Sequence, residues 1–258
     1  MTSIPLIHPD RSRPRFRPIK AWRHFRALVA NKEDTEQVFH VIEALNGRAL
    51  LKNLKKFVAT PEGRARLEEN IDLVKLLDDH EALRKLPEGS VGAAYLEFME
   101  REGLSAQGLV DEFDRFNVHR KSYDDLIERF GHRLRDTHDL FHVLTGYGRD
   151  ALGEACVLGF SHGQNPGFGV IFIARMGGLE IRKSLPRGLP VMRAINQARR
   201  AGKKARSIVA QDIQSLLAEP LHAARKRLGI PPPTLYEQIH RELQAKGISP
   251  MQVMAPGG

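Results

Sequence analysis

Hydrophobic residues recur at helical spacing along most of the chain from Ile19 onward. One such stripe is formed by Val38, Ile42, Leu45 and Ala49, whose spacing of three or four residues places them on one face of an α-helix. No stretch shows the convincing alternation of a strand, and the chain carries no internal repeat. The pattern therefore predicts an all-α fold, organised as a single-domain bundle of helices.

Breaks that contain proline and glycine separate the predicted helices. Thr60 and Ser90 are good N-cap residues, and Pro61 suits the first position of a helix. Each cap precedes apolar residues that share one helix face: Leu67, Ile71, Val74 and Leu77, then Val91, Ala94, Tyr95, Phe98 and Met99. Residues 211–228 predict a further amphipathic helix, which Gly229 and the three prolines after it would end.

The pattern changes at both ends of the chain. Residues 1–18 mix arginine with proline and predict an extended basic arm, which either lies on an acidic surface or is solvated. Residues 19–233 form the predicted all-α domain, and residues 234–258 a C-terminal helix and tail. The N-terminus lacks the apolar centre of a secretory signal, so we do not expect export.

The composition narrows the class of protein. With 41% hydrophobic and 28% charged residues, the chain resembles neither a disordered protein nor a multi-span membrane protein. No apolar run approaches the ~18 residues of a spanning helix. Cys156 is the single cysteine of the chain, which excludes an intramolecular disulfide. Because it lies in an apolar run, we expect it in the core.

The net charge of +9 favours partners that carry phosphates, anionic lipid headgroups or acidic side chains. Residues 182–206 contain nine Lys or Arg and no acid, with apolar residues interleaved. This segment suits an interfacial helix on an anionic membrane surface, and equally a solvated basic face. Because no nucleic-acid-binding motif appears, we expect no nucleic-acid partner.

The residues that carry chemistry lie between Ser122 and Glu154. Ser122 is a candidate cap for a helix whose apolar stripe leads onto His138. His142 lies one turn further along the same face, with ~5–6 Å between the Cβ atoms, and Asp139 lies at the edge of that face. The spacing predicts that the two imidazoles can share one ion.

A second helix is expected to bring a further acid to this pair. Gly146 and Gly148 should end the first helix, and Arg149 or Asp150 should begin the next, which predicts an αα-hairpin with its tip near Tyr147. His142 lies five residues before the tip and Glu154 seven after it, so the two should reach similar depth. Glu154 has apolar neighbours in sequence, and a buried carboxylate there needs a positive partner. We therefore expect Glu154 to complete the site.

Two imidazoles and one or two carboxylates suit one divalent metal, Zn or Fe, with coordination positions left for water or substrate. Magnesium fits less well because it prefers oxygen ligands. The alternative is a pair of partly buried histidines bonded to backbone or carboxylate groups. His132 falls on another face, and His162 follows a glycine-rich turn where it could support the site or be merely a polar loop residue, so neither is assigned to the site.

The segment His138-Asp139-x-x-His142, followed by eleven residues and Glu154, resembles the signature of the Coq-four family of ubiquinone biosynthesis. The similarity includes residues 86–95, 133–136 and 215–228, and covers roughly residues 35–233. The resemblance implies an all-α fold and a metal held by those four residues. It also implies peripheral attachment to a quinone-producing membrane and membership of a complex with other quinone-biosynthesis proteins.

The implied activity is oxidative decarboxylation of a polyprenylated 4-hydroxybenzoate-type acid at ring carbon one, with dioxygen as a candidate co-substrate. In that case His138, Asp139, His142 and Glu154 are catalytic as metal ligands. Arg133 or Arg135 could pair with the substrate carboxylate, although exposed arginines are more often solvated. Residues 30–39 resemble bacterial members, which favours the cytoplasmic side of a bacterial inner membrane over the mitochondrial matrix face.

Two other classes of function stay open. The first is a non-catalytic lipid-binding scaffold, in which the metal fixes the hairpin and the glycine-containing apolar segments 159–163 and 167–174 hold a prenyl tail rather than merely packing closely. The second is a metal-dependent phosphohydrolase, which needs a further histidine and aspartate on separate helices. A homo-oligomer is compatible with each of these functions.

Overall fold

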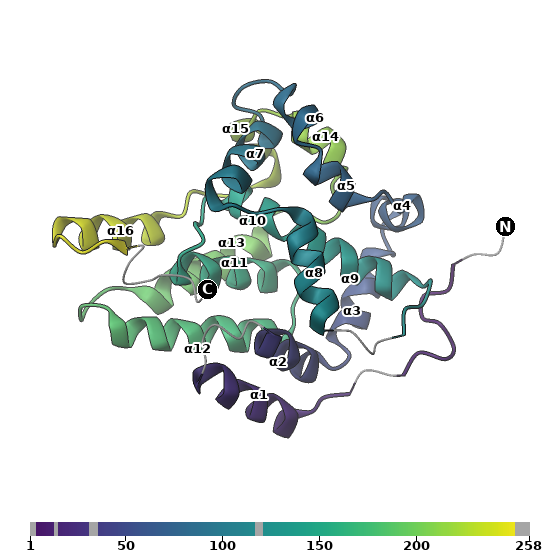
Figure 1. The fold of residues 1–258 in the computed structure, drawn as a ribbon, viewed down its shortest axis with the longest axis horizontal. Coiled ribbons are helices and arrows are strands. Elements are labelled where there is room, and N and C mark those ends of the chain that lie inside the picture. The colour runs from purple at the N-terminus through teal and green to yellow at the C-terminus, as the bar shows by residue number, and fades with distance from the viewer. Residues whose placement is uncertain (1–3, 13–14, 31–35, 117–120, 251–258) are drawn as a thin grey trace. The chain divides into compact units, whose positions relative to one another are not determined.

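The computed structural model describes residues 4–12, 15–30, 36–116 and 121–250. These residues form sixteen α-helices and no strand, with one isolated bridge between Ser90 and Pro220. The predicted all-α class is therefore confirmed (Figure 1). The chain divides into two compact units that alternate along the sequence, and each is described by itself.

Unit 1 comprises residues 1–15, 48–144 and 207–228. Its helices are α3 (Ala49–Phe57), α4 (Pro61–Glu69), α5 (Leu73–Asp78), α6 (His80–Arg84), α7 (Val91–Glu102), α8 (Ala106–Phe116), α9 (Leu126–Asp136), α10 (His138–Thr145), α14 (Ile213–Ala218) and α15 (Leu221–Leu228). Unit 2 comprises residues 16–47, 145–206 and 229–258. Its helices are α1 (Pro18–Ala30), α2 (Glu36–Asn46), α11 (Ala151–Gln164), α12 (Phe168–Ser184), α13 (Val191–Lys204) and α16 (Thr234–Ala245).

The predicted caps form as expected. The Thr60 hydroxyl accepts from the N–H of Gly63, and Pro61 is the first residue of α4. The Ser90 hydroxyl accepts from the N–H of Ala93 at the start of α7. Each bond satisfies an N–H group that the helix itself leaves without an acceptor.

Two of the predicted helices are each split in two. Asn70 adopts a left-handed conformation (φ +46°) that ends α4 before α5, and Ile71 is left exposed. Pro220, which has no N–H, separates α14 from α15 within the predicted helix 211–228. The chain around Pro220 bonds instead to residues near Ser90, since the Val91 N–H donates to the Glu219 carbonyl at 2.8 Å and the Leu221 N–H to the Gly89 carbonyl at 2.8 Å.

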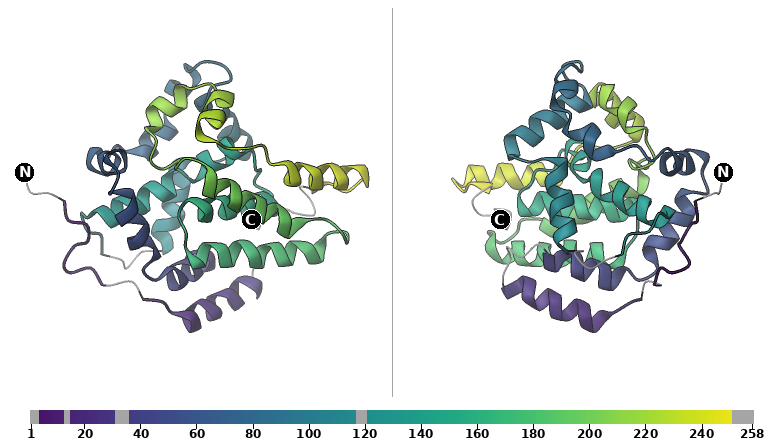
Figure 2. Two further views of the ribbon diagram at one scale, coloured as in Figure 1. Left: turned by 180° about the vertical axis from the view of Figure 1, so that it is seen from behind. Right: turned by 45° about the vertical axis from the view of Figure 1, so that its right-hand side comes forward.

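In unit 2, α11 packs against both α12 and α13, which appear as neighbouring green helices in both views of Figure 2. Glycines allow the close approach of α11 and α13. A Cβ atom at Gly202 would lie 2.1 Å from the Phe160 carbonyl oxygen, and one at Gly163 would lie 2.4 Å from that of Arg199. The glycines at 159–163 therefore serve backbone packing.

The interfacial-helix interpretation of residues 182–206 is wrong. Of the interleaved apolar residues, Met192 is half-buried and the others are buried in unit 2, namely Leu185, Leu189, Val191 and Ile195. The buried four have no surface to offer to lipid. The basic residues of α13 lie on its other side, where Arg193, Arg200, Lys203 and Lys204 are exposed. This segment is thus the solvated basic face that the sequence allowed as its alternative.

Residues 4–12 of the predicted N-terminal arm lie on the acidic start of α9, whereas residues 15–18 are exposed. The N–H groups of Leu126 and Ile127 donate to the carbonyls of Pro5 and Leu6 at 3.0 and 3.2 Å. The Arg11 guanidinium donates two hydrogen bonds to Asp125, at 2.7 and 2.9 Å, and a third to Glu128. Of the two expected states of the arm, contact with an acidic surface is the one observed for residues 4–12.

We expect Arg11→Ala to destabilise unit 1 by about 2–3 kcal/mol, because it removes charged hydrogen bonds to the fully buried Asp125. Hydrogen bonds from Ser122, Tyr123 and Arg11 outweigh burial and lower the pKa of Glu128. The ionised Glu128 carboxylate therefore stabilises the folded state at neutral pH. This stabilisation is lost as the pH falls from the ordinary pKa of Glu, which applies to the unfolded chain, to the lowered pKa of Glu128 in the folded chain. Urea unfolding at neutral and acidic pH would measure both effects.

Arg84→Ala is the matched control, since Arg84 pairs with Glu100 and both are exposed. An exposed pair contributes about 0–1 kcal/mol. Equal losses in the two variants would contradict a stabilising role for the docked arm.

Candidate metal centre

The helix that leads to the candidate site begins at Asp125. Its carboxylate accepts from the N–H of Glu128 at 3.0 Å and is fully buried. The predicted cap, Ser122, is wrong: its hydroxyl donates to the Glu128 side chain instead. Asp125 is the better anchor because it also accepts from Arg11 and from the His8 N–H.

The single long helix expected through His138 is interrupted at Thr137. There the backbone leaves helical geometry (φ −91°, ψ +4°), and the threonine hydroxyl donates to the Arg133 carbonyl at 2.7 Å. Such a bond competes with the helical ladder. α10 therefore begins at His138, and Asp139 lies in its first turn, where a helix stabilises negative charge.

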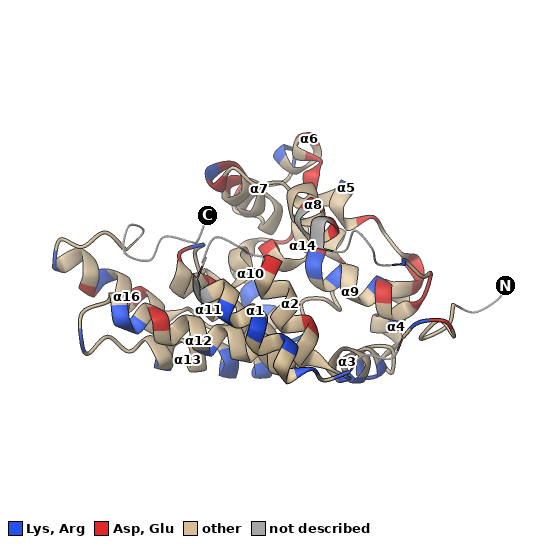
Figure 3. Ribbon diagram, turned by 60° about the horizontal axis from the view of Figure 1, so that its bottom comes forward, with Lys and Arg blue, Asp and Glu red and all other residues tan. Residues whose placement is uncertain are grey.

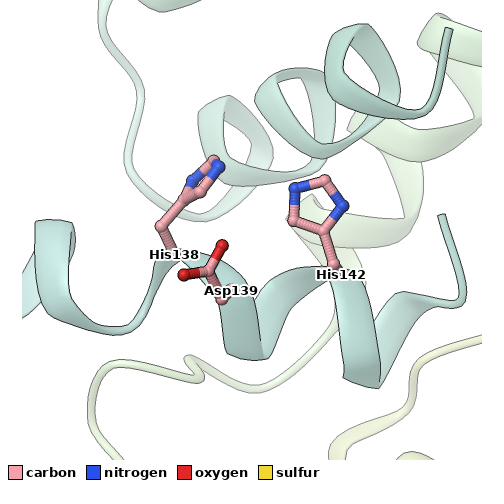
Figure 4. Close-up of side chains that lie close together, drawn as sticks. All are labelled: His138, Asp139 and His142. Carbon is pink, nitrogen blue, oxygen red and sulfur yellow. The ribbon is translucent and has the colours of Figure 1, made fainter. Parts of the chain in front are cut away.

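The first turns of α10 bring together His138, Asp139 and His142. The side chains extend from one side of the helix (Figure 4), and one ligand atom from each lies within 4.8 Å of those of the other two. The two imidazole centroids are 5.2 Å apart. His142 is 1% exposed and Asp139 9%, whereas His138 is half-buried. We call this cluster the α10 triad.

The α10 triad has suitable donors for a transition metal. Two ligands that each lie about 2.1 Å from one ion are at most about 4.2 Å apart, so small side-chain rotations would let the three atoms converge. Two imidazole nitrogens and one carboxylate oxygen suit Zn or Fe. The residues present therefore fit the expected ion.

Two residues of α7 also belong to the surroundings of the triad. The Phe98 ring stacks on His142 with centroids 5.4 Å apart. Tyr95, one turn earlier, is fully buried, and its hydroxyl has no hydrogen-bond partner among the described residues. Burial, together with the charges of Asp139 and Asp78, raises the pKa of Tyr95. Sequence analysis placed both aromatics on a core stripe and gave no signal that Phe98 contacts His142 or that Tyr95 lies near Asp139.

The far end of α10 is held by Arg225 of α15. Its guanidinium donates to the carbonyls of Leu144 and Val143, both at 3.0 Å. These carbonyls lie in the last turn, which the helix leaves without N–H partners. Gly146 follows with φ +78°, so the predicted end of the helix is confirmed.

The two arginines before the triad have partners within unit 1. Arg133 is buried and donates to the carbonyls of Val209 and Gln211 at 2.5 and 2.6 Å. Burial lowers its pKa to about 10, which leaves it charged at neutral pH. Arg135 donates to Asp136 at 2.7 Å. Arg133 thus holds the segment before α14, and the geometry gives neither arginine a substrate role.

Glu154 lies on α11 of unit 2. Its side chain is 30% exposed, and the Arg149 Nε atom is 3.6 Å from its Oε1. A positive neighbour is therefore present without an ion, and the expected wholly apolar setting is only partly observed. The convergence of Glu154 with the α10 triad stays a prediction.

The start of α11 is fixed by a buried network. Asp150, fully buried, accepts from the N–H groups of Leu152 and Gly153 at 3.1 and 3.2 Å. The Tyr236 hydroxyl of α16 donates to Asp150 and accepts from the Gly148 N–H at 3.1 Å. Sequence reasoning missed Tyr236, because it is 86 residues from Asp150. Cys156 is buried as expected, and burial raises its pKa.

Comparison with known proteins settles the family. Residues 21–234 match the family model described as coenzyme Q (ubiquinone) biosynthesis protein Coq4. The chain belongs to the Coq4 family. Its relatives include the mitochondrial ubiquinone biosynthesis protein COQ4 homolog of Bos taurus, 29% identical over 76% of this chain and 71% of that protein. The Mus musculus homolog is 29% identical over 69% of this chain and 64% of that protein.

A solved structure shares the fold of this Coq4 member. The crystal structure of a protein from Nostoc punctiforme PCC 73102, provisionally assigned to ubiquinone biosynthesis, has a TM-score of 0.62 at 22% identity. It covers 83% of this chain and 99% of its own. The animal relatives named above are mitochondrial proteins. Among the described residues, no helix is long and apolar enough to cross a membrane.

Proposed function

We propose that this Coq4 family member is a metal-dependent enzyme of ubiquinone biosynthesis that replaces the ring carboxylate of a polyprenylated 4-hydroxybenzoate-type acid by hydroxyl. The observation that carries the proposal is the α10 triad, with three ligand atoms within 4.8 Å of one another in a largely buried setting. In balanced form, the aromatic acid, dioxygen, two electrons and two protons give the phenol, carbon dioxide and water. A two-electron reductant is therefore also required.

In this proposal His138, Asp139 and His142 hold one Zn or Fe ion, with Glu154 as the fourth ligand. An ion held there would supply electrophilic stabilisation to the reacting carboxylate. Phe98 keeps the His142 imidazole in place by stacking on it. Tyr95 retains its phenolic proton because its pKa is raised, so it is available to donate a hydrogen bond to a substrate oxygen.

The proposed setting is the cytoplasmic side of a bacterial inner membrane, beside other quinone-biosynthesis proteins. A prenylated substrate would be dissolved in that membrane, and a protein without a spanning helix among its described residues would have to meet it at the surface. The family's role in ubiquinone biosynthesis supports this placement.

The second candidate is a non-catalytic scaffold in which the ion only stabilises the fold. Arg149 favours it, since this residue gives Glu154 a charged partner other than an ion. In that case the ion would have no position open to substrate, and activity in a reconstituted pathway would follow the amount of folded protein.

Metal analysis of the purified full-length protein tests the proposal. We expect about one Zn or Fe per chain, and a chelator should abolish conversion of a short-tailed prenyl-4-hydroxybenzoate supplied with dioxygen and a reductant. Adding the ion back should restore conversion. Full turnover by metal-free protein would overturn the enzyme hypothesis. Unfolding in step with metal loss, with no conversion by intact metal-loaded protein, would favour the scaffold.

A further inference from the structure

The exposed side of α1 in unit 2 carries large apolar side chains that the described residues leave uncovered. Ile19 is 86% exposed and Trp22 58%. Phe16, just before the helix, is also exposed, and its ring lies 6.1 Å from that of Phe168, the exposed first residue of α12. Neighbouring large apolar side chains of this kind mark an interaction surface.

This exposure does not arise because α1 lacks packing. Ala21 and Phe25 are buried on the opposite side of the helix, where they form a core cluster with Val41, Ala44 and Leu45 of α2. Ile19 is on the side of the helix opposite Ala21, whereas the Trp22 ring lies at the edge of the core, 5.8 Å from the Phe25 ring, and is still 58% exposed. α1 therefore has one apolar face for the protein and a second, outer one for a partner.

The outer face also carries positive charge. Arg23 and Arg26 are exposed, and at four and seven residues from Ile19 they share its face. Residues 18–30 contain no acid, and Lys20 beside this face pairs with Glu43 of α2 at 3.0 Å. Basic positions recur along α1 in Figure 3. We call Ile19, Trp22, Arg23 and Arg26 the outer α1 surface.

We propose that the outer α1 surface docks this protein onto an anionic lipid bilayer, with the apolar side chains among the headgroups and the arginines on their phosphates. Tryptophan favours the membrane interface because its ring is apolar and its N–H is polar. Arginine at such a surface binds lipid phosphate as a fork. The proposal refines the membrane location in the proposed function and is independent of the metal chemistry.

The composition of the surface favours lipid over a second copy of the chain. Two copies meeting through this face would bring Arg23 and Arg26 of each close to those of the other. Like charges that approach in this way are unfavourable. An anionic bilayer offers an apolar interior for Ile19 and Trp22 and negatively charged headgroups for Arg23 and Arg26.

Trp22 is the only tryptophan, so its fluorescence reports directly on this surface. Vesicles of phosphatidylcholine with phosphatidylglycerol should shift the Trp22 emission of the full-length protein to shorter wavelength. The protein should also co-sediment with these vesicles. Vesicles of phosphatidylcholine alone should do so much less. Arg23→Gln/Arg26→Gln should weaken binding roughly 10- to 30-fold, since each basic residue near an anionic surface is worth about 1 kcal/mol. Ile19→Ser should also reduce sedimentation.

Arg200→Gln/Lys203→Gln on α13 is the matched control, because it removes two exposed positive charges from the same unit. The proposal is supported if the control loses less affinity for the anionic vesicles than Arg23→Gln/Arg26→Gln does. It is overturned if the control loses more. Binding without a shift of Trp22 emission would also overturn it. A blue shift that grows with protein concentration in the absence of lipid would assign the surface to self-association instead. Metal content should be unchanged in all variants, which separates this test from that of the α10 triad.

Discussion

His142→Ala is expected to weaken metal binding and to abolish turnover while the chain stays folded. The imidazole is 1% exposed and supplies one of the three ligand atoms of the α10 triad. Four-ligand zinc sites bind with about 10–16 kcal/mol, or about 3 kcal/mol for each ligand, so loss of one should weaken affinity by roughly two orders of magnitude. Metal titration, the decarboxylation assay and thermal unfolding of the metal-free protein would measure the three consequences.

His132→Ala provides the control, because His132 is a half-buried histidine of α9 that is not part of the α10 triad. It should retain both metal and activity. A His142→Ala protein that binds the metal as tightly as the wild type would rule out the triad as the site. If metal-free wild-type and variant proteins both unfold at markedly lower temperature, and activity falls only with the folded fraction, the scaffold function is the better account.

The clustering of the triad could be predicted because it depends on local geometry alone. Residues three and four positions apart on a helix are neighbours whatever the rest of the fold does, and His142 is three residues from Asp139 and four from His138. His138, Asp139 and His142 therefore come together even though the helix starts at His138 rather than near Ser122. The contribution of Glu154 is of a different kind, because it depends on how two helices meet.

The positions where helices break could not be predicted with the same success. At Thr137 and Pro220 the sequence continues an apolar stripe, yet the helix breaks. At Thr137 the side-chain hydroxyl bonds back to the Arg133 carbonyl of the preceding turn. Around Pro220 the backbone bonds instead to residues near Ser90. Asp125 replaces Ser122 as a cap for a similar reason. Its advantage comes from Arg11, more than a hundred residues away, which no local rule contains.

Amphipathic patterns also fail to say what covers an apolar face. The stripe in residues 182–206 suggested contact with lipid, yet the protein buries it against α11. Helix α1 has two apolar faces, and only the structure shows that Phe25 is inside and Trp22 outside. Spacing predicts that a face exists, and tertiary packing decides its partner.

Asp150→Ala is expected to have the largest effect on folding stability, at about 3–4 kcal/mol. The loss of an N-cap costs about 1–2 kcal/mol. A further 1–3 kcal/mol follows because the buried Tyr236 hydroxyl loses its acceptor. The variant also loosens the turn before α11, which carries Glu154. Urea unfolding would measure the stability, and metal titration would show whether the orientation of Glu154 contributes to affinity.

Asp72→Ala is the matched control, since Asp72 caps α5 through the Lys75 N–H at 3.0 Å but is exposed. It should cost about 1 kcal/mol, the value of a cap alone. Tyr236→Phe should recover part of the loss in the Asp150→Ala background, because it removes the hydroxyl left without an acceptor. If Asp150→Ala and Asp72→Ala destabilise equally, the bond between Asp150 and Tyr236 adds nothing beyond capping.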